Sequence, residues 1–438
     1  MLVDIRVRTR QWLAVGSFVF ACWFVSGCDQ SQPAAEDAAG TAAADTDAAA
    51  AEPVAVDSGP EVPENPLRDV YFGDTHIHTI LSFDAYLMGT RNTPDDAYDF
   101  AKGAAISHAS GFQMQMKKPL DFLAVSDHAF YLGMMREIAE GRIEHPLGET
   151  VKGAVDPEGS AAAFAAVIGH LQRLGAEGGA DDLDNREVAR SAWQEVIEAA
   201  ERHNDPGNFT TFVAYEYTAS GLQFQNLHRN VIFESANVPR APFPRLDSLN
   251  PEDLWDWMDE NRDKGMDAIA IPHNSNGSDG WMFQKTTFLG DPLDAAYAEQ
   301  RMRNDPLVEN TQVKGTSDTH PLLSPNDEWA DFELMELRVA SQLSSRPEGS
   351  YVREAYLNGL LMEEEQGFNP YRFGVIGSSD GHNASAPVEE DNYHGKLPLL
   401  DGSAGIRMRQ SLWLPEGMPG GARWSAAGLA AVWAEENT

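Results

Sequence analysis

The chain has 438 residues, with 68 acidic and 32 basic side chains and a formal net charge of -36. This charge argues against binding of a nucleic-acid polymer, because binding a phosphate backbone needs a basic surface. A small anionic molecule is still a possible partner. A hydrophobic fraction of 42% excludes disorder along the whole length, and two cysteines exclude a disulfide scaffold or a cysteine-rich zinc module. The length allows one barrel-sized domain with appendages or two ordinary domains, and it leaves the oligomeric state open.

The N-terminal residues 1–27 have the pattern of an export signal. Three arginines between positions 6 and 10 precede an apolar run over 12–25, which is shorter than the ~20 residues that span a membrane. The run closes with Val25-Ser26-Gly27-Cys28, a string that resembles a bacterial lipobox. This resemblance implies cleavage before Cys28, a lipid anchor on its thiol, and a membrane-anchored lipoprotein on the periplasmic face. An ordinary signal peptide that happens to contain cysteine is the alternative.

Residues 28–66 form a predicted tether. They are rich in alanine, proline and acidic residues and contain no basic or aromatic side chain. Such a segment cannot bury enough apolar surface to become ordered, so it is predicted to space the remaining residues, 67–438, from the membrane.

Seven short apolar runs in residues 67–438 have the composition of strands, and polar residues follow or interrupt most of them. The runs are 70–73, 122–125, 212–215, 227–233, 268–271, 332–337 and 373–376. Runs that alternate with helices indicate an α/β protein with a parallel sheet or barrel, whose active site lies at the carboxyl ends of the strands.

Helix signals lie between these runs. Thr93-Pro94 and Asn250-Pro251 each combine an N-cap residue with a first-turn proline, and Gly265 is expected to end the second of these helices. A third helix is predicted over 351–361. Residues 134–205 have few strand signals and two predicted helices, so we interpret them as a mostly helical insertion over or beside the site.

Histidines gather at the predicted strands. His76 and His78 are two residues apart, so a strand points both imidazoles to the same face. Any one of these histidines alone is more simply explained as a structural residue, and the hypothesis rests on their accumulation. Imidazole and carboxylate ligands suit zinc, manganese or iron, and nine of them exceed the need of one ion, so two or three divalent metal ions are expected. The nine candidate ligands are His76, His78, Asp84, His128, Glu216, His228, His273, Asp380 and His382.

The spacing of these ligands resembles the PHP superfamily, named after polymerase and histidinol phosphatase domains. Four spaced motifs in the same order carry the resemblance, and further strings are similar to the bacterial domain-of-unknown-function family 3604. The motifs are Asp74-Thr75-His76-Ile77-His78 with Ser82-Phe83-Asp84, Ser126-Asp127-His128, Glu216 with His228 and His273, and Ser379-Asp380-Gly381-His382. The further strings are residues 227–233, Lys314-Gly315, Thr319-His320-Pro321 and residues 432–438, and the resemblance covers residues 68–438.

This resemblance implies a distorted seven-stranded (β/α) barrel, similar to a TIM barrel, with a site for two or three metals. It assigns one ion to His76, His78, Glu216 and Asp380, a second to Glu216, His228 and His273, and a third to Asp84, His128 and His382. The family often has histidine where this chain has Asp84, so the third site is expected to be weak. The family pattern also continues beyond residue 438, so a C-terminal segment is expected to be missing.

The function expected from these ligands is a metal-dependent hydrolase, in the first place a phosphoesterase, because paired ions activate water and stabilise charge on a phosphoryl oxygen. Asp127 would orient a ligand histidine, with a strand-end cap as the alternative. Arg229, Lys314 and Arg353 are candidates to bind a small anionic substrate, although a surface salt bridge is the simpler explanation for each. His320 is either a further ligand or acid, or an ordinary loop histidine.

Two other functions stay open. The same kind of site could hydrolyse a sulfate ester, a phosphonate or an amide, because a fold does not fix a reaction. The chain could also be a metal-binding lipoprotein without catalytic activity.

Overall fold

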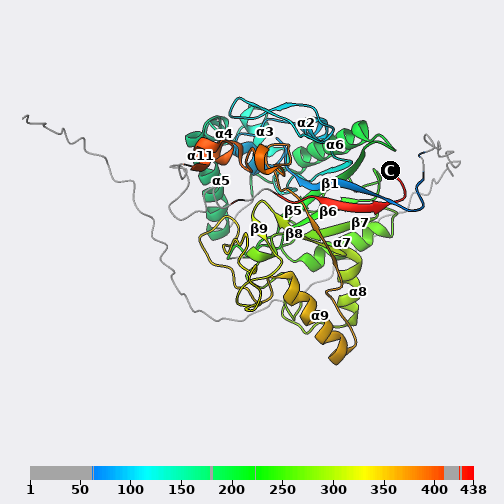
Figure 1. Ribbon diagram of the computed structural model, residues 1–438. Coiled ribbons are helices and arrows are strands. Elements are labelled where there is room, and N and C mark those ends of the chain that lie inside the picture. The colour runs from blue at the N-terminus through cyan, green and yellow to red at the C-terminus, as the bar shows by residue number, and fades with distance from the viewer. Residues whose placement is uncertain (1–61, 63, 178–180, 222, 409–423, 425–426) are drawn as a thin grey trace, which may run out of the picture. The chain divides into compact units, whose positions relative to one another are not determined.

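A curled six-stranded sheet with the order β11-β1-β4-β5-β6-β7 lies at the centre of the structure, which is a computed structural model (Figure 1). Strands β1, β4 and β5 are parallel, whereas β11 runs antiparallel to β1, and β6 runs antiparallel to both β5 and β7. The strands are β1 (Asp69–Ile77), β4 (Phe122–Val125), β5 (Thr210–Tyr217), β6 (Arg229–Phe233), β7 (Ala268–Pro272) and β11 (Ala430–Ala434).

The structure describes residues 62, 64–177, 181–221, 223–408, 424 and 427–438, all within the compact unit of residues 59–438. The predicted export signal, Cys28 and most of the predicted tether therefore lie outside the described residues. In the part of the chain that is described, none of the helices has the length and apolar character needed to cross a membrane.

A smaller sheet lies beside β7. It consists of β10 (Gly374–Gly377), β8 (Leu307–Gln312) and β9 (Gly315–Thr316), with β10 parallel and β9 antiparallel to β8. Strand β8 contacts β7, and past the end of β10 a parallel bridge joins Gly381 to Ile77 of β1. A short hairpin of β2 (Ile106–Ser107) and β3 (Gln113–Met114) is separate from both sheets.

Six of the seven predicted strands are present, and the prediction of a strand over 332–337 is wrong. Phe332 and Glu333 lie in a turn, residues 334–336 have no regular structure, and Leu337 forms only an isolated bridge with Ser344. Phe332 is 61% exposed, and the run does not alternate between the core and solvent. Strand β8, which was missed, has only two apolar residues and buries Glu309 and Gln312. The edge strand β11 and the short strands β2, β3 and β9 were not predicted either. The expectation of a parallel sheet is also wrong at β6, because the connection from β5 to β6 contains no helix to carry the chain back across the sheet.

The three predicted helices are confirmed as α2 (Pro94–Ala101), α7 (Pro251–Arg262) and α9 (Val352–Gln366). The Thr93 hydroxyl accepts the N–H of Asp96 at the start of α2, and the Asp96 carboxylate accepts the N–H of Thr93 in return. Asn250 caps α7 by accepting the N–H of Glu252. Gly265, with φ at +81°, follows the end of α7 and lets the chain turn in a conformation that other residues resist.

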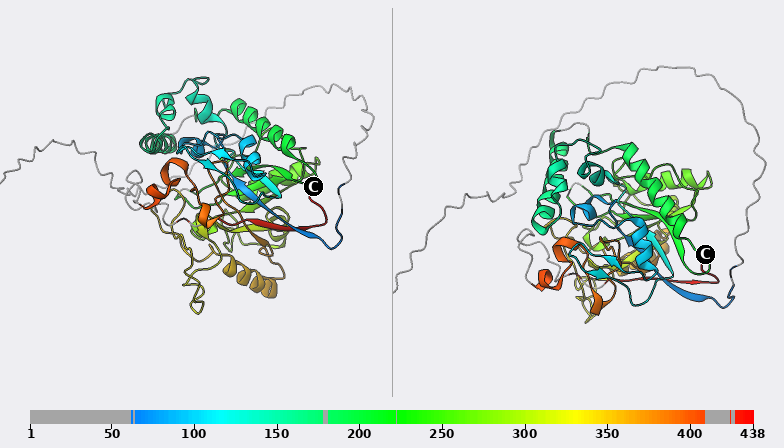
Figure 2. Two further views of the ribbon diagram at one scale, coloured as in Figure 1. Left: turned by 45° about the horizontal axis from the view of Figure 1, so that its top comes forward. Right: turned by 90° about the horizontal axis from the view of Figure 1, so that it is seen from above.

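Four helices rather than two lie in the predicted insertion, residues 134–205. They are α3 (Met134–Ala139), α4 (Gly148–Lys152), α5 (Pro157–Glu177) and α6 (Arg186–His203). Helix α6 packs on β4 and β5, whereas α3, α4 and α5 contact one another at one side of the sheet (Figures 1 and 2). The remaining helices are α1 (Phe83–Leu87), α8 (Ala295–Asn304), α10 (Pro398–Asp401), α11 (Ala404–Met408), η1 (Ser275–Gly277) and η2 (Glu390–Asn392).

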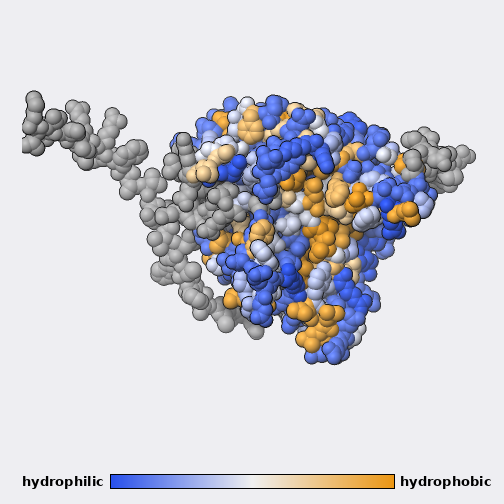
Figure 3. Space-filling model, viewed as in Figure 1, coloured by the Kyte–Doolittle hydropathy of each residue, from blue (hydrophilic) through white to orange (hydrophobic). Residues whose placement is uncertain are grey.

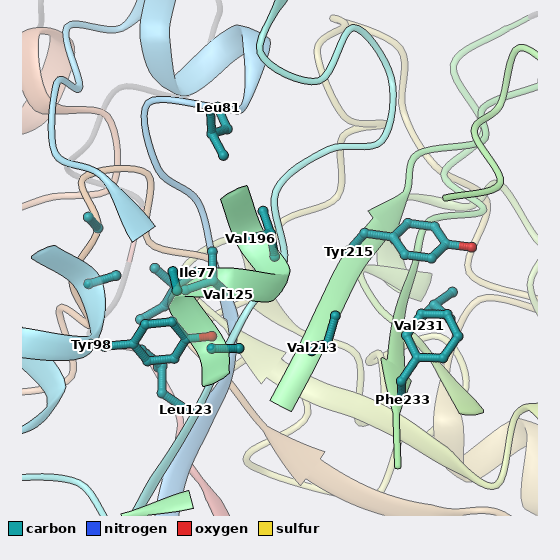
Figure 4. Packing of buried hydrophobic residues seen from close by; sticks show 14 of the residues in the cluster. Ile77, Leu81, Tyr98, Leu123, Val125, Val196, Val213, Tyr215, Val231 and Phe233 are labelled. Carbon is teal, nitrogen blue, oxygen red and sulfur yellow. The ribbon is translucent and has the colours of Figure 1, made fainter. Parts of the chain in front are cut away.

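The main core lies between the sheet and the helices α2 and α6 (Figure 4). Strands β1, β4, β5 and β6 contribute alternate side chains to it, such as Val125, Val213 and Phe233, and α2 and α6 contribute Tyr98 and Val196. Full burial of one such side chain stabilises the fold by roughly 1.5–3 kcal/mol.

A smaller apolar layer lies on the opposite face of the sheet. It contains Ala124, Ala214, Ile232 and Ile271 from four successive strands of the sheet, and Leu307 of β8 and Ile376 of β10 pack against them. Since side chains alternate along a strand, the residues two places before or after these point in the same direction.

Apolar side chains also appear on the outer surface. Figure 3 shows them in the middle of one face and at its lower tip, where α9 lies. In α9 they are Leu357, Leu360 and Leu361, which are all exposed.

Candidate metal centre

The nine predicted ligands meet at one edge of the curled sheet, on the face that carries the smaller apolar layer. Glu216 follows Ala214 by two residues in β5, and His273 follows Ile271 in the same way at the end of β7. His228 comes from the start of β6, because an antiparallel strand begins at the edge where its neighbours end. The site is thus built from the ends of parallel strands and the beginning of one antiparallel strand.

Glu216 lies at the centre and its two oxygens face different histidines. Its Oε2 lies 3.4 Å from His76 Nε2 and 3.3 Å from both His78 Nε2 and His128 Nδ1. Its Oε1 lies 2.8 Å from His228 Nδ1 and 3.6 Å from His273 Nε2. One buried carboxylate therefore contacts five imidazoles, an arrangement suited to bridging two cations.

Asp380 is a second carboxylate that contacts both His76 and His78. Its Oδ1 lies 3.5 Å from His76 Nε2 and 3.4 Å from His78 Nε2. The residue has φ at +58°, a left-handed backbone that is uncommon outside glycine and costs of order 1–3 kcal/mol where it is not otherwise favoured. This strain aims the Asp380 carboxylate into the cluster directly after β10.

Asp84, from the short helix α1, joins two further rings. Its Oδ1 lies 3.2 Å from His128 Nε2 and its Oδ2 lies 2.9 Å from His382 Nε2. Together with His78, these residues form a third set whose ligand atoms lie within 4.8 Å of one another.

The buried polar atoms of the cluster fit divalent cations. Two further sets of ligand atoms lie within the same 4.8 Å: His76, Glu216 and His273, and His76, His78 and Asp380. The Nε2 atoms of His76 and His78 and both ring nitrogens of His273 are buried and have no hydrogen-bond partner. Buried polar atoms are otherwise almost always hydrogen-bonded, and this donor set suits zinc, manganese or iron, so these sets could hold metal ions.

Residues behind the ligands fix the orientation of three rings. Glu309 Oε2 lies 2.9 Å from His76 Nδ1, Ser82 Oγ lies 2.9 Å from His78 Nδ1, and Thr218 Oγ1 lies 2.6 Å from His128 Nδ1. In the first two cases the free Nε2 faces the carboxylates at the centre.

Asp127 contacts the His78 ring indirectly, through Ser82. Its carboxylate accepts hydrogen bonds from Thr79 and, at 2.7 Å, from the hydroxyl of Ser82, the residue that contacts the His78 ring. Asp127 can therefore orient the ring of His78 through Ser82, as predicted for a ligand histidine. The ring of His128, the neighbour of Asp127 in the sequence, contacts Thr218 instead.

Two lysines flank Asp380: Lys396 is buried and Lys314 is partly buried. Lys314 forms an ion pair with its Oδ2, and Lys396 Nζ lies 2.7 Å from its Oδ1 and 2.8 Å from His382 Nδ1. Burial lowers the pKa of Lys396 to about 8 against the opposing effect of Asp380, whereas for Lys314 burial is outweighed by Asp380 and the pKa is raised. Cationic groups beside the cluster can bind an anion.

The pKa values in the cluster favour an ionised Glu216, and they differ widely between the neighbouring rings of His76 and His78. Burial opposes ionisation of Glu216, but His128, His273 and His228 hold its pKa well below the usual range. Burial also opposes protonation of His76, yet Glu309 and Asp380 raise its pKa to about 10. For His78, burial and the neighbouring rings of His382 and His128 lower the pKa to about 3. A cation other than a proton relieves this competition.

Three other predicted site residues lie elsewhere. Arg229 is buried in an ion pair with Asp305, 3.1 Å away, and its guanidinium lies near the ring of Trp255, so it holds β6 to α7 and to the end of α8. His320 contacts Glu336 through Nε2 at 2.9 Å. Arg353 forms exposed ion pairs with Asp318 and Asp327. These contacts do not involve the cluster, and Trp255 is buried.

Three residues that contact the cluster, Glu309, Lys396 and Thr218, were missed by the sequence analysis. Glu309 escaped notice because β8 has too few apolar residues to be recognised as a strand. Lys396 lies in a loop and belongs to no motif, so only the folded chain brings its side chain to Asp380.

Comparison with known proteins gives one match. A family model with the description "Protein of unknown function (DUF3604)" matches residues 65–438. Neither the curated proteins nor the solved structures contain a significant match to this chain.

Proposed function

Since the chain belongs to the DUF3604 family, whose description names no activity, we propose its function from its own site: a metal-dependent hydrolase, and specifically a phosphoesterase. The observation that carries the proposal is the buried cluster of six histidines and three carboxylates with two lysines beside it. Bound zinc, manganese or iron would supply a Lewis acid and a water molecule of lowered pKa.

The residues of the chain have separate tasks in this proposal. His76, His78, Glu216 and Asp380 would hold one ion, and Glu216 would share the second with His228 and His273. The third set, around Asp84, is complete in donors, so we include a third ion in the proposal. Glu309, Ser82 and Thr218 keep the rings from rotating, so that the ligands need little rearrangement when substrate binds.

Lys314 and Lys396 would bind the substrate. Each ammonium group contacts an oxygen of Asp380 at the side of the cluster; Lys396 is buried, and the side chain of Lys314 is 11% exposed. Once cations neutralise Asp380, these groups can donate hydrogen bonds to the oxygens of a small phosphate ester and stabilise the charge that builds on them. This pairing favours an anionic substrate over a neutral amide.

We also propose that the two sheets close into a distorted barrel of the PHP type. The smaller apolar layer contains residues of β4, β5, β6 and β7 with neighbours in β8 and β10, as the interior of a barrel would. The bridge between Ile77 and Gly381 then brings the end of β10 to β1. Membership of the PHP superfamily would explain both this closure and the order of the ligands along the chain.

The location of the protein is part of the same proposal. The pattern of residues 1–28 supports export and a lipid anchor on Cys28, which would place the site outside the cytoplasm, at the membrane. Incorporation of labelled fatty acid by the wild type and not by Cys28→Ser supports the anchor, and labelling of both, or of neither, contradicts it.

A substrate panel tests the reaction. The purified protein, loaded with zinc, manganese or iron, is assayed on nitrophenyl phosphate, bis(nitrophenyl) phosphate, nitrophenyl sulfate, a phosphonate monoester and a nitroanilide. We expect release of nitrophenol from a phosphate ester and a loss of roughly 10³-fold in Glu216→Gln, because metal ions contribute several kcal/mol to such reactions. His203→Ala, a substitution on α6, is the control and should keep full activity.

The same panel separates the alternatives. Turnover of the sulfate or the amide alone would replace the phosphoesterase by another hydrolase on the same site. Metal-loaded protein that hydrolyses none of the five substrates would contradict the proposal and favour a metal-binding lipoprotein without catalysis.

A further inference from the structure

A second kind of metal site lies in the helical insertion, away from the centre described above. His145, in the loop between α3 and α4, and His170, in α5, both turn Nε2 toward the carboxylate of Asp182. The distances are 3.2 Å from His145 Nε2 to Asp182 Oδ2 and 2.7 Å from His170 Nε2 to Asp182 Oδ1. The three ligand atoms lie within 4.8 Å of one another, and none of the three residues belongs to the main cluster.

One of these atoms is poorly satisfied without an ion. The side chain of His145 is only 3% exposed, and its Nε2, although near Asp182, makes no hydrogen bond of acceptable geometry. A buried polar atom without a hydrogen bond is unusual, and here it points at a carboxylate and a second imidazole. The two rings lie 5.5 Å apart at an angle of 77°, so each can present its Nε2 to a common point.

We propose that His145, His170 and Asp182 bind a zinc-like divalent transition ion. Two imidazoles and one carboxylate are a common ligand set for zinc, and three protein ligands leave a position for water or another donor. Asp182 is 53% exposed, so the ion can enter from solvent without opening the fold.

Binding requires one local change at His145. Its Nδ1 accepts the N–H of Leu147 at 3.1 Å, which leaves the proton of the neutral ring on Nε2. When Nε2 binds an ion, this proton moves to Nδ1 and the bond from Leu147 is given up. The cost is one part-buried hydrogen bond, which is small beside the free energy of zinc binding by three ligands.

The ion would fasten three segments of the insertion together beside the wall of the main site. Asp181, next to Asp182, accepts a hydrogen bond from the hydroxyl of Tyr131. The Tyr131 ring stacks on Phe130, and both contact Phe83, whose ring lies 5.4 Å from that of His128. The proposed ion therefore stabilises the packing behind one ligand of the main centre without contacting it.

The number of zinc ions bound by the full chain tests this proposal. Calorimetric titration with zinc chloride, followed by elemental analysis, is carried out on the wild type, His170→Ala and Asp182→Asn. We expect each variant to bind one zinc ion fewer per chain than the wild type. His203→Ala is the matched control, because His203 also contacts a carboxylate and its side chain is, like that of His170, 13% exposed.

The background of Glu216→Gln keeps this result separate from the main centre. In that background, zinc should still raise the melting temperature, and His170→Ala should make this rise smaller. Equal zinc content in His170→Ala and the wild type, or a rise of the same size with and without His170→Ala, would overturn the proposal whether or not the protein is a phosphoesterase.

Discussion

At the scale of single residues, Glu216 is the carboxylate that joins the histidines of the candidate metal centre. Five histidines face its two oxygens at 2.8–3.6 Å, and the carboxylate is almost fully buried. In a metal-free protein such a group is expensive to bury, because its charge is compensated only by rings that compete for protons. Bound cations would compensate this charge and would make the arrangement less costly.

A histidine outside the centre should make stability depend on pH. His108 is buried, and burial and the neighbouring His394 lower its pKa to about 4. The folded protein thus prefers the neutral ring, so its stability is complete above pH 6.5 and falls as the pH drops toward 4, by up to about 3 kcal/mol. Denaturant unfolding with chelator present, at pH 7.5 and pH 5, measures this loss.

His108→Gln removes the titrating ring and keeps a polar side chain. Its free energy of unfolding should fall less between the two pH values than that of the wild type. An unchanged difference between the two pH values would show that His108 is not responsible. Chelator in every sample removes the separate contribution of metal binding.

At the scale of elements, the prediction from sequence succeeded where a pattern is local. Helices α2 and α7 begin at the predicted caps because Thr93 and Asn250 act on residues three or fewer positions away. Strands that end near a candidate ligand were predicted because an apolar run and a histidine or carboxylate follow each other in the sequence. Strand β8 was missed because it is polar, and its role depends on a neighbour, β10, that comes much later in the chain.

The same reasoning explains which site residues could be predicted. The nine ligands lie in four motifs, and the structure brings all nine together. Lys396 could not be found, because no local signal marks it, and Arg229 seemed a candidate although its alternation along β6 points it away from His228 toward Asp305. Side-chain direction and partners that are distant in sequence are what a single sequence does not contain.

The role of β8 can be tested through Glu309. Glu309→Gln keeps the shape of the side chain, but its amide can donate to His76 Nδ1, which moves the ring proton to Nε2, the atom that faces the centre. We expect the affinity for metal and the activity to fall about 10–100-fold, as for other residues that support a ligand. Competition with a chelator of known affinity measures the change.

Glu252→Gln is the control for this substitution. Glu252 lies on α7, is partly buried and accepts the N–H of Phe288 at 2.6 Å, outside the cluster. Equal metal affinity in Glu309→Gln and Glu252→Gln would mean that β8 does not support the centre.

At the scale of the whole molecule, acidity and metal binding are linked. The chain has a net charge of -36, and a part of its acidic side chains is buried where two or three cations would lie. Removing those cations leaves carboxylates and imidazoles in contact without compensation. The stability of the fold should therefore depend on the ions as well as on the core.

Chelation measures this dependence. Treatment with EDTA should lower the melting temperature by roughly 5–15 °C, because ligands at a large excess over their Kd contribute a few kcal/mol to stability. Zinc or manganese should restore it, and Glu216→Gln should respond less than the wild type. An unchanged melting temperature, with loss of metal shown by elemental analysis, would contradict the link.

The contacts that seat Asp380 beside β1 set the order of events during biosynthesis. The hydroxyls of Thr75 and Ser378 lie 2.6 Å apart although 303 residues separate them, and Ser379 donates its N–H to Asp74 across 305 residues. Such distant contacts form late, because closing so long a loop is entropically costly. A growing chain therefore presents His76 and His78 long before Asp380 exists, and a complete centre can form only after synthesis has passed His382. Ions bound by such a centre would be those available where folding finishes, so the compartment of folding would help to determine the metal.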